Sequence, residues 1–236
     1  MIPIYETFHA FQGEGYHMGK DAYFIRSHGC HVRCSFCDSA GTWHQKFMPK
    51  DVVKLSDEDI AKSILNQSAP TIIITGGEPT LHKWQGVLDL VRKVPESIPV
   101  ENKALKGAKR VHIETCGNLE FFEDFDWVTL SPKKEAPPCA RSLRVCNELK
   151  LIATGVDFVN EWKSVINKVD DIPIWLHPEW SLRSNPSVLR AITDAVKYGD
   201  PRFRAGYQLH KLYSCDSLDE RSRPLVPLGG VEDNGY

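Results

Sequence analysis

The chain has 236 residues, a formal net charge of −2 and a 42% share of apolar residues. This charge excludes the basic footprint of a nucleic-acid-binding domain, and the apolar share excludes a largely disordered chain. No apolar run approaches the roughly 20 residues that a membrane-spanning helix needs. The first residues lack the basic and apolar pattern of an export signal, so we expect a cytoplasmic protein with no membrane partner and no direct nucleic-acid partner.

Short apolar runs that favour β-strands alternate along the chain with longer amphipathic segments. The predicted strands are 22–26, 71–75, 110–115, 127–130, 148–152 and 172–176, with a later one at 204–209. Most are apolar throughout, which is typical of parallel strands covered on both faces. This order predicts an α/β fold, and six main strands are too few for a closed eight-stranded barrel. We therefore predict a partial, open parallel β/α barrel of about six strands.

Four segments between the strands carry the period of a helix. Ser56 can cap the first of them, and Pro186 opens the last at its first helical position. The apolar faces would be formed by Ile60, Ile64 and Leu65; by Leu81, Trp84, Val87, Leu88 and Val91; by Phe158, Trp162, Val165, Ile166 and Val169; and by Val188, Leu189, Ile192 and Val196. The stretch 133–145, rich in proline and basic residues, is predicted to be a loop.

The end of the chain differs in character from the rest. From residue 214 it is rich in charged and polar residues and has no periodicity of a helix or strand. We therefore predict one domain over 1–213 and a polar C-terminal extension over 214–236.

Three cysteines, Cys30, Cys34 and Cys37, follow the first predicted strand with Cys-x3-Cys-x2-Cys spacing. Three thiolates on one loop can converge on a single soft metal centre. A four-iron cluster usually takes four cysteines, so three would leave one iron open to bind a substrate or cofactor. Disulfides are not expected, because the count of seven cysteines is odd and an export signal is lacking.

The same triplet also fits a zinc site that a fourth ligand completes, since Cys3His zinc sites are common. The candidates for that ligand are His28, His31, His44 and Cys116. Zinc sites usually place their ligands as two separated pairs, and the sequence has no second Cys-x2-Cys pair. The triplet thus favours an iron–sulfur cluster over zinc without excluding zinc. The cysteines interpreted as ordinary thiols are Cys116, Cys139, Cys146 and Cys215.

Other polar motifs stand at the ends of predicted strands. Gly-Gly-Glu-Pro at 76–79 follows the second strand, Ser-Pro-Lys at 131–133 the fourth and His-Pro at 177–178 the sixth, while Gln-Gly-Glu-Gly at 12–15 precedes the first. Adjacent glycines permit positive φ and a close approach of the backbone to a ligand. Each motif alone also fits an ordinary turn. Because functional loops gather at the carboxyl ends of parallel strands, we expect these motifs and the cysteine loop to meet at one face.

Together, the motifs resemble those of the radical S-adenosylmethionine superfamily. This resemblance rests on the cysteine triplet, with Phe36 before its last cysteine, and on the Gly-Gly-Glu-Pro turn. The sequence further resembles one family, the 7-carboxy-7-deazaguanine synthases of the queuosine pathway. The segments that carry this second resemblance are 11–15, 24–26, 37–39, 42–43, 75–79, 114–117, 131–133 and 208–211. The similarity runs from about residue 4 to residue 211.

The resemblance implies one [4Fe-4S] cluster on Cys30, Cys34 and Cys37, with S-adenosylmethionine on the open iron. The residues implied in binding S-adenosylmethionine are Phe36, Gly77, Glu78, Ser131, Pro132 and Lys133. Those implied in gripping a pterin substrate are Gln12, Gly13, Glu14, Arg26 and Thr75. Arg26 suits a carboxylate, because its planar fork binds both oxygens. Ser39 stands where the family often has threonine, and its hydroxyl would be the Mg²⁺ ligand.

The implied reaction is a radical ring contraction of 6-carboxy-5,6,7,8-tetrahydropterin to 7-carboxy-7-deazaguanine with loss of ammonia. It would make the protein a carbon–nitrogen lyase of queuosine and deazapurine biosynthesis, whose product serves tRNA modification or the modification of DNA. A 5′-deoxyadenosyl radical would take hydrogen from C6 of the pterin and the hydrogen would later return, so no catalytic residue is assigned beyond the cofactor radical. Besides the pterin, the expected partners are an electron donor such as a flavodoxin and a second copy of the chain in a homodimer.

Two other functions share the cysteine triplet. A radical activase of a glycyl-radical enzyme would act on a partner's glycine and should lack the pterin set Gln12, Glu14 and Arg26. A non-catalytic zinc or iron–sulfur module would need a fourth protein ligand and a shallow site without the Gly-Gly-Glu-Pro turn.

The sequence also departs from the family at some positions. Some relatives end soon after the stretch that matches 208–211, with a terminal carboxylate near the substrate, whereas this chain continues. Cys116 stands where asparagine is frequent, and His177 where glutamine is common, so an adenine contact is not assigned to His177.

Overall fold

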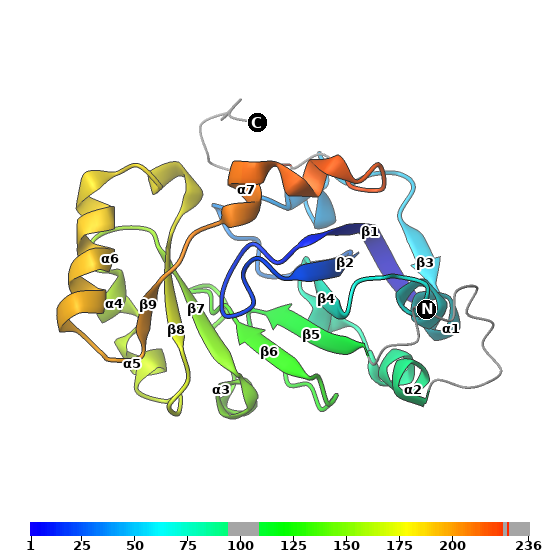
Figure 1. Cartoon of the computed structure of the whole chain (residues 1–236), viewed down its shortest axis with the longest axis horizontal. Helices are drawn as coiled ribbons and strands as arrows, with labels where there is room; N and C mark the ends of the chain where they lie inside the picture. Colours follow the sequence, from blue (N-terminus) through cyan, green and yellow to red (C-terminus); the bar gives the residue numbers. More distant parts are fainter. Residues whose placement is uncertain (94–108, 224–225, 227–236) are drawn as a thin grey trace.

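The computed structural model describes residues 1–93, 109–223 and 226. Within these ranges the backbone forms one nine-stranded sheet in the order β3-β1-β2-β4-β5-β6-β7-β8-β9. The strands are β1 (Ile2–Phe11), β2 (Asp21–Ser27), β3 (Val53–Leu55), β4 (Thr71–Gly76), β5 (Arg110–Thr115), β6 (Trp127–Leu130), β7 (Glu148–Ala153), β8 (Ile174–Pro178) and β9 (Phe203–Ala205). Figure 1 shows the sheet curving, with most helices along its outer face.

Strand β2 and strands β4 to β9 are parallel neighbours, which confirms the predicted partial β/α barrel. The sheet is nevertheless mixed, because β1 pairs antiparallel with both β2 and β3. Neither β1 nor β3 was predicted, since the polar side chains of β1 and an irregularity between Ile4 and Glu6 interrupt its apolar pattern. The last predicted strand, 204–209, is wrong in its second half: β9 ends at Ala205, and a helix begins at Leu209.

The helices are α1 (Asp57–Leu65), α2 (Gln85–Lys93), α3 (Ala140–Val145), α4 (Phe158–Glu161), α5 (Lys163–Ile166), α6 (Pro186–Tyr198) and α7 (Leu209–Tyr213). The main core lies between the outer face of the sheet and α1, α2, α4, α5 and α6. A much smaller cluster of Phe8, Ala22, Phe24 and Ile73 lies apart from it. No helix in the described ranges is long and apolar enough to cross a membrane.

Two helix predictions are confirmed by their caps. The hydroxyl of Ser56 accepts a hydrogen bond from the Asp59 amide at the start of α1, at 3.1 Å. Asn185 caps α6 in the same way, with Pro186 at the first helical position. On α6 only part of the predicted apolar face is buried, because Leu189 and Val196 remain partly exposed.

Three other predictions of local structure need correction. The second helix begins at Gln85 rather than at Leu81, which ends a separate 3₁₀ helix and is 43% exposed. The third predicted helix is broken at Trp162 into α4 and α5. The stretch 133–145 is not all loop, since α3 occupies its last six residues behind an N-cap at Cys139. Helical period is a weak guide in segments this short.

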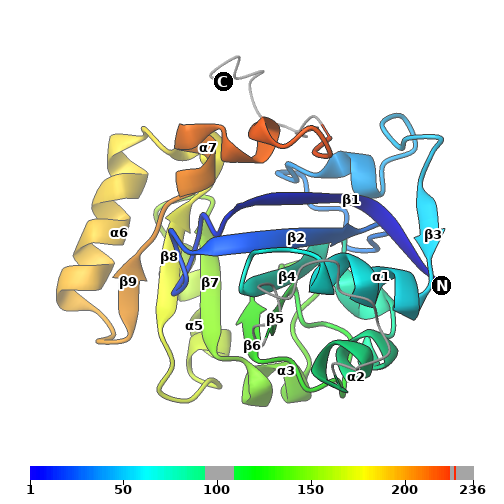
Figure 2. The same ribbon diagram turned by 45° about the vertical axis from the view of Figure 1, so that its right-hand side comes forward.

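The turn between β1 and β2 closes the open side of the curved sheet. Its Gly13 carbonyl accepts from the amide of Leu209 in α7 at 3.0 Å, and the Tyr16 amide donates to Glu148 of β7 at 2.8 Å. Figure 2 shows the hairpin lying across the opening, with its turn beside β7 and β8. Residues from the beginning and from the end of the chain therefore meet at one place.

Candidate active site

A cavity of about 890 Å³ lies within the curve of the sheet. The predicted site residues that line it are Gln12, Gly13, Glu14, Arg26, Cys30, Cys34, Phe36, Cys37, Ser39, Thr75, Gly77, Glu78, Ser131 and Lys133. Of the predicted set only Pro132 is not part of the lining. The structure thus brings the cysteine loop and the other motifs to one face, as the sequence predicts.

The cysteine loop is shaped by two residues with positive φ, Gly29 at 104° and Arg33 at 57°. Arg33 holds a left-handed conformation that is uncommon for a residue with a Cβ, so the loop bends sharply there. The amide of Cys37 donates to the Cys34 carbonyl at 3.3 Å, and the Trp43 ring nitrogen donates to the Cys37 Sγ at 3.4 Å. These contacts turn the loop back on itself and place its thiols against the cavity.

The cysteines lie in largely apolar surroundings. Cys34 packs with Val32, Cys116 and Ala136, and burial raises the pKa of Cys34 to about 11. Burial also raises the pKa of the thiols of Cys30 and Cys37. In the described part of the chain no three His, Cys, Asp or Glu side chains are already arranged as a metal site. The donor set itself, three thiols on one bent loop, fits a soft metal centre, whose positive charge favours the thiolate form.

The end of β4 lies against the backbone of the cysteine loop. The Glu78 amide donates to the Gly29 carbonyl at 2.8 Å, and the Gly77 amide donates to the Ser27 carbonyl at 3.1 Å. A Cβ on Gly77 would collide with the Gly29 carbonyl, and Gly76 has φ of 132°. Glycine is therefore required at both positions for the two loops to meet.

The Glu78 carboxylate is buried and occupied by other protein groups. It accepts from the amide and hydroxyl of Thr80, the hydroxyl of Thr115 and the amide of Cys116. A carboxylate has about four acceptor positions, so these bonds hold β4 to β5. The predicted contact of Glu78 with the ammonium group of S-adenosylmethionine stays a prediction.

Lys133 places a positive charge near the cysteines. Its ammonium group donates to the carbonyl of Ser131 at 2.7 Å and to the Ser131 hydroxyl at 2.8 Å. Burial lowers the pKa of Lys133, while attraction to Cys34 and Glu78 opposes that shift. The loop after β6 thus orients a cation over the cluster side of the cavity.

Glu114 of β5 holds two of the predicted pterin-binding residues. It accepts from the side-chain amide of Gln12 at 2.8 Å and from the Thr75 hydroxyl at 3.2 Å. The Gln12 side-chain oxygen in turn accepts from the Glu14 amide at 3.0 Å. Glu114 lines the cavity but was given no role from sequence, although it opens the motif 114–117. That motif was the available signal.

Glu14 forms a buried ion pair with Lys150 of β7, and both side chains line the cavity. Burial alone would raise the pKa of Glu14, but attraction to Lys150 holds it well below its usual range. The pKa of Lys150 is raised, because Glu14 and Glu114 outweigh the effect of burial. Lys150 was missed from sequence, although a lysine within an apolar strand is a signal of a buried partner.

Arg26 is held by carboxylate and hydroxyl groups around it. Its Nε donates to Glu6 at 2.6 Å, and its Nη1 donates to the Ser39 hydroxyl at 3.3 Å. That hydroxyl donates to Asp38 at 3.1 Å, and Asp38 pairs with Lys211 at 2.9 Å. Burial opposes the charge of Arg26, yet Glu6 and Asp38 raise its pKa above the ordinary value. Glu6 and Asp38 were not predicted as site residues.

His177 does not line the cavity. It is fully buried, burial lowers its pKa to about 4, and neither ring nitrogen has a partner among the described residues. Gly206 packs so closely that a Cβ there would collide with the His177 ring. The neighbouring residues that do line the cavity are Pro178, Glu179, Trp180 and Ser181.

Four comparisons with known proteins are relevant. The model of the Radical SAM superfamily matches residues 24–134. The chain is 34% identical over 214 residues to the 7-carboxy-7-deazaguanine synthase of Flavobacterium psychrophilum, with 89% of this chain and 91% of that protein covered. It is 38% identical over 233 residues to the enzyme of that name from Prochlorococcus marinus, with 89% and 96% covered.

A solved structure, described as the crystal structure of QueE from Escherichia coli, matches with a TM-score of 0.68 and 27% identity. The match covers 89% of this chain and 94% of that one. The partial barrel and the cysteine triplet at the end of its first parallel strand define a radical S-adenosylmethionine enzyme, with an iron–sulfur cluster and S-adenosylmethionine as cofactors. Within that class, the identities over nearly full length place the chain in the 7-carboxy-7-deazaguanine synthase family.

Proposed function

We propose that the protein is a 7-carboxy-7-deazaguanine synthase, which contracts the ring of 6-carboxy-5,6,7,8-tetrahydropterin and releases ammonia. One observation carries the proposal. A single cavity holds the three cysteines of the loop and, facing them, a buried set of polar groups around Gln12, Glu14 and Arg26. This set contains donors, acceptors and a cation, which are the groups that a carboxylated pterin needs.

When bound, the cluster and S-adenosylmethionine supply a 5′-deoxyadenosyl radical. The protein must hold one carbon of the substrate close to that radical and keep water away. Phe8, Phe24 and Phe36 line the cavity and add apolar surface beside the polar groups.

The polar groups have distinct tasks in this proposal. Arg26 binds the substrate carboxylate with its planar fork, because an arginine can bond both oxygens at once. Glu14, kept ionised by Lys150, accepts hydrogen bonds from ring N–H groups. Gln12 and Thr75 are held in place by Glu114 and contact the remaining edge of the ring.

Ser39 is the proposed Mg²⁺ ligand. Its hydroxyl lines the cavity next to the Asp38 carboxylate and within hydrogen-bond distance of Arg26. Mg²⁺ takes oxygen ligands and keeps several waters, so one hydroxyl together with substrate oxygens suits it. The ion would therefore bind where the substrate carboxylate meets Arg26. The S-adenosylmethionine contacts proposed for Phe36, Gly77, Ser131 and Lys133 lie on the cluster side.

The rival functions fit the cavity less well. An activase of a glycyl-radical enzyme should lack Gln12, Glu14 and Arg26, whereas here all three line one cavity beside the cysteines. A non-catalytic zinc or iron–sulfur module should have a shallow site, whereas this cavity has a volume of about 890 Å³.

We further propose an electron donor such as a flavodoxin, a homodimer and a cytoplasmic location, with tRNA modification as the use of the product. All seven cysteines are free, which suits a reducing compartment. The donor follows from the chemistry, since the cluster must be reduced. The homodimer rests on the family resemblance alone.

The decisive experiment is turnover of 6-carboxy-5,6,7,8-tetrahydropterin by anaerobically reconstituted, reduced protein with S-adenosylmethionine and Mg²⁺. We expect 7-carboxy-7-deazaguanine and ammonia in equal amounts. Protein that contains zinc instead of iron, or that cleaves S-adenosylmethionine without consuming the pterin, would contradict the proposal. Protein purified with Cys37→Ala is the matched control for background conversion.

A further inference from the structure

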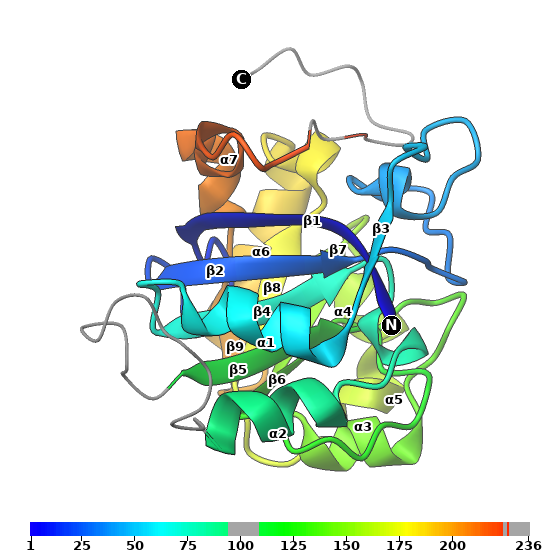
Figure 3. The same cartoon turned by 90° about the vertical axis from the view of Figure 1, so that its right-hand side faces the viewer.

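The C-terminal extension forms one wall of the cavity. We call the described part of it, residues 214–223 and Val226, the C-terminal wall. Its residues that line the cavity are Asp216, Ser217, Ser222 and Arg223. Figure 3 shows the chain after α7 passing above β1. The wall adjoins Ser39, because Val226 forms a β-bridge with it.

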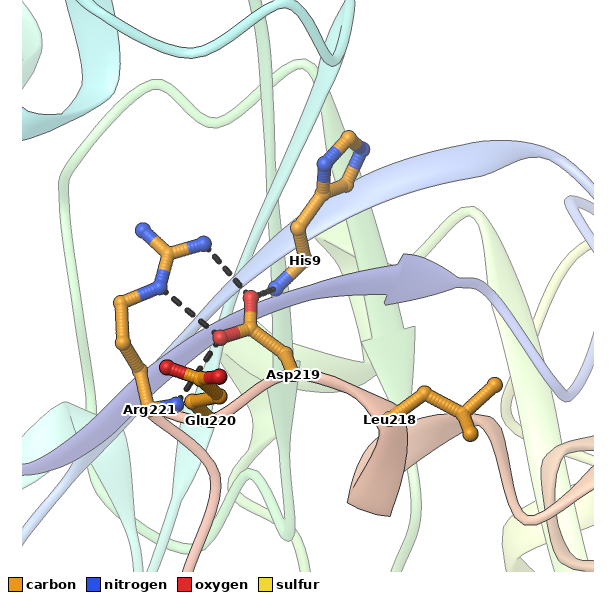
Figure 4. Close-up of a pocket in the computed structure, with 5 residues that line it drawn as sticks. All are labelled: His9, Leu218, Asp219, Glu220 and Arg221. Carbon is orange, nitrogen blue, oxygen red and sulfur yellow. Dashed lines mark hydrogen bonds and ion pairs between the residues drawn. The ribbon is translucent and has the colours of Figure 1, made fainter.

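Specific contacts fix the C-terminal wall to the domain. The Asp219 carboxylate accepts a hydrogen bond from the His9 amide of β1 at 2.7 Å (Figure 4). The same carboxylate accepts from Arg221 Nη2 at 2.5 Å and from Arg221 Nε at 2.9 Å. Further along, the Val226 amide donates to the Asp38 carbonyl at 3.2 Å, and the Val226 carbonyl accepts from the Ala40 amide at 3.0 Å. The wall is thereby attached both to β1 and to the loop that carries Ser39.

The wall also reaches Arg26 through one intermediate side chain, Glu6. Glu6 lies directly opposite Arg26 in the antiparallel register of β1 and β2, and its side chain is only 4% exposed. One of its carboxylate oxygens accepts from Arg26 Nε at 2.6 Å, and the other accepts from the backbone amide of Arg223. With both oxygens engaged, the carboxylate has a fixed orientation.

That fixed orientation constrains Arg26 in turn. The guanidinium group has five N–H donors in one plane. Glu6 takes the Nε–H and Ser39 accepts from Nη1, so the plane is set and the group faces the cavity that Arg26 lines. Side-chain entropy makes a free arginine a poor receptor for a carboxylate, and holding it in advance removes part of that loss.

We propose that Glu6 is a positioning residue that aims Arg26 at the substrate carboxylate, and that the backbone amide of Arg223 holds Glu6 for this task. The inference rests on the proposed function, because it takes a carboxylated pterin as the substrate. It gives the C-terminal wall a part in specificity: the wall contributes to discrimination between a pterin with the carboxylate and one without it.

Glu6→Gln provides the first test, since it keeps the size of the side chain. Its amide group has one oxygen, which can accept, and one nitrogen, which can only donate, whereas Arg26 and Arg223 both present donors to it. One of the two contacts must therefore be lost. A change of substrate specificity is expected rather than a general loss of structure.

The measurement is binding of 6-carboxypterin and of unsubstituted pterin to the reconstituted holoenzyme with S-adenosylmethionine, by titration calorimetry. The parent protein should prefer 6-carboxypterin. In Glu6→Gln the affinity for 6-carboxypterin should fall about tenfold, equivalent to 1.4 kcal/mol, while the affinity for pterin changes by less than about twofold. An equal loss for both ligands would mean a merely structural role and would overturn the inference.

Arg223 offers a matched pair of variants that isolates its amide. Arg223→Pro removes the backbone N–H that donates to Glu6, together with the guanidinium group. Arg223→Ala keeps that N–H and removes only the guanidinium contacts with Tyr5 and Asp51. Arg223→Pro should lower the preference for 6-carboxypterin further than Arg223→Ala does. Combined with Glu6→Gln, it should add little, because both changes act on Arg26 through the same side chain. Equal effects of the two Arg223 variants, or additivity with Glu6→Gln, would contradict the proposal.

The outcomes also separate this inference from the proposed function. A parent protein that binds pterin as tightly as 6-carboxypterin would overturn both. A parent that prefers 6-carboxypterin, together with a Glu6→Gln variant that prefers it equally, would overturn the positioning role alone and leave the proposed function intact.

Discussion

The two sides of the cavity are built in different ways. The cluster side consists of short loops whose backbones contact one another, such as the Glu78 amide on the Gly29 carbonyl. The substrate side consists of charged and polar side chains that meet from distant parts of the chain, as Glu14 meets Lys150. Each motif of the cluster side is a short run of consecutive residues and depends on glycines, whereas the substrate side depends on buried pairs between separate segments.

This difference suits the two ligands. S-adenosylmethionine and the cluster are common to the whole superfamily, so backbone geometry that many sequences can adopt is sufficient for them. A carboxylated pterin must be distinguished from other heterocycles, and directional bonds from buried side chains provide that discrimination, since an unmatched polar group there is costly. Substitutions on the cluster side should therefore affect cofactor retention, and those on the substrate side should affect substrate affinity.

The largest effect is expected for the cysteines of the loop. Cys37→Ala should remove the cluster and leave no measurable turnover, because the chain has no spare thiol on that loop. Joint replacement of Cys116, Cys139, Cys146 and Cys215 by alanine should leave the iron content unchanged. The measurement is the iron content of each variant after anaerobic purification, compared with that of the parent. Loss of the cluster in the fourfold variant would show that one of those thiols is a ligand.

On the substrate side, Lys150→Met should destabilise the fold by about 3–5 kcal/mol, because it leaves Glu14 buried without its partner. In the parent the pKa of Glu14 is lowered, so Glu14 contributes stability above its unfolded pKa and loses it only as the pH falls through the folded value. Without Lys150, burial raises the pKa of Glu14, and protonation relieves the penalty. Denaturant unfolding should therefore show a deficit that shrinks from pH 8 to pH 5.

The matched control for that prediction is Lys197→Met, since Lys197 is exposed on α6. Its effect should stay within about 0.5 kcal/mol at every pH. A deficit in Lys150→Met that does not vary with pH would argue against an ionised Glu14 in this site.

Gly77→Ala tests the backbone contact on the cluster side. The added Cβ would collide with the Gly29 carbonyl, so the cysteine loop must shift, with a loss of about 1–3 kcal/mol in stability. S-adenosylmethionine binding should weaken while pterin binding changes little. Gly155→Ala is the control, because a Cβ there meets no atom within 4 Å. Equal behaviour of the two variants in unfolding and ligand titrations would contradict the tight contact.

Arg26→Lys should raise the Michaelis constant for the pterin about tenfold, because lysine keeps the charge but loses the planar fork. A poorly held substrate should also permit uncoupled cleavage of S-adenosylmethionine, measured as 5′-deoxyadenosine formed in excess of product. Arg190→Lys on the exposed face of α6 serves as the control. Unchanged coupling in Arg26→Lys would remove Arg26 from the substrate contacts.

The smallest effect is expected for Ser39→Ala. Turnover should fall a few-fold at limiting Mg²⁺ and recover at high Mg²⁺, with S-adenosylmethionine binding largely intact, because the ion contacts substrate rather than cofactor. Ser39→Thr keeps the hydroxyl and should behave as the parent does. Identical Mg²⁺ titrations of the alanine variant and the parent would show that the hydroxyl is not a ligand.

The same contrast explains how much the sequence could predict. Strands β5 and β6 were predicted at their observed boundaries, because buried parallel strands are continuous apolar runs bounded by turns. The cysteine loop and the glycine turn were found because each motif consists of a few consecutive residues. Strand β1 was missed, since Glu6 and other polar residues on it serve the site or the wall rather than an apolar core.

The missed site residues share one property. Each of them acts through a partner that is separated from it in the sequence. Glu6 pairs with Arg26, Asp38 with Lys211, Glu114 with Gln12 and Lys150 with Glu14. Their partners become evident only once strand order and register are known, because register decides which side chains face each other. The charges were visible in the sequence, but their pairing was not.

The hydrogen bond between the Leu209 amide and the Gly13 carbonyl joins two residues that leave the ribosome at very different times. At about 5–20 residues per second, roughly 10–40 s pass between their syntheses. During that interval the nascent chain already contains the complete cysteine loop, while the Gly13 carbonyl still lacks its partner in α7. A chain truncated before α7 would therefore carry an intact cluster motif, and its turn after β1 would keep the contacts with β5 and β7 but lose the one with Leu209.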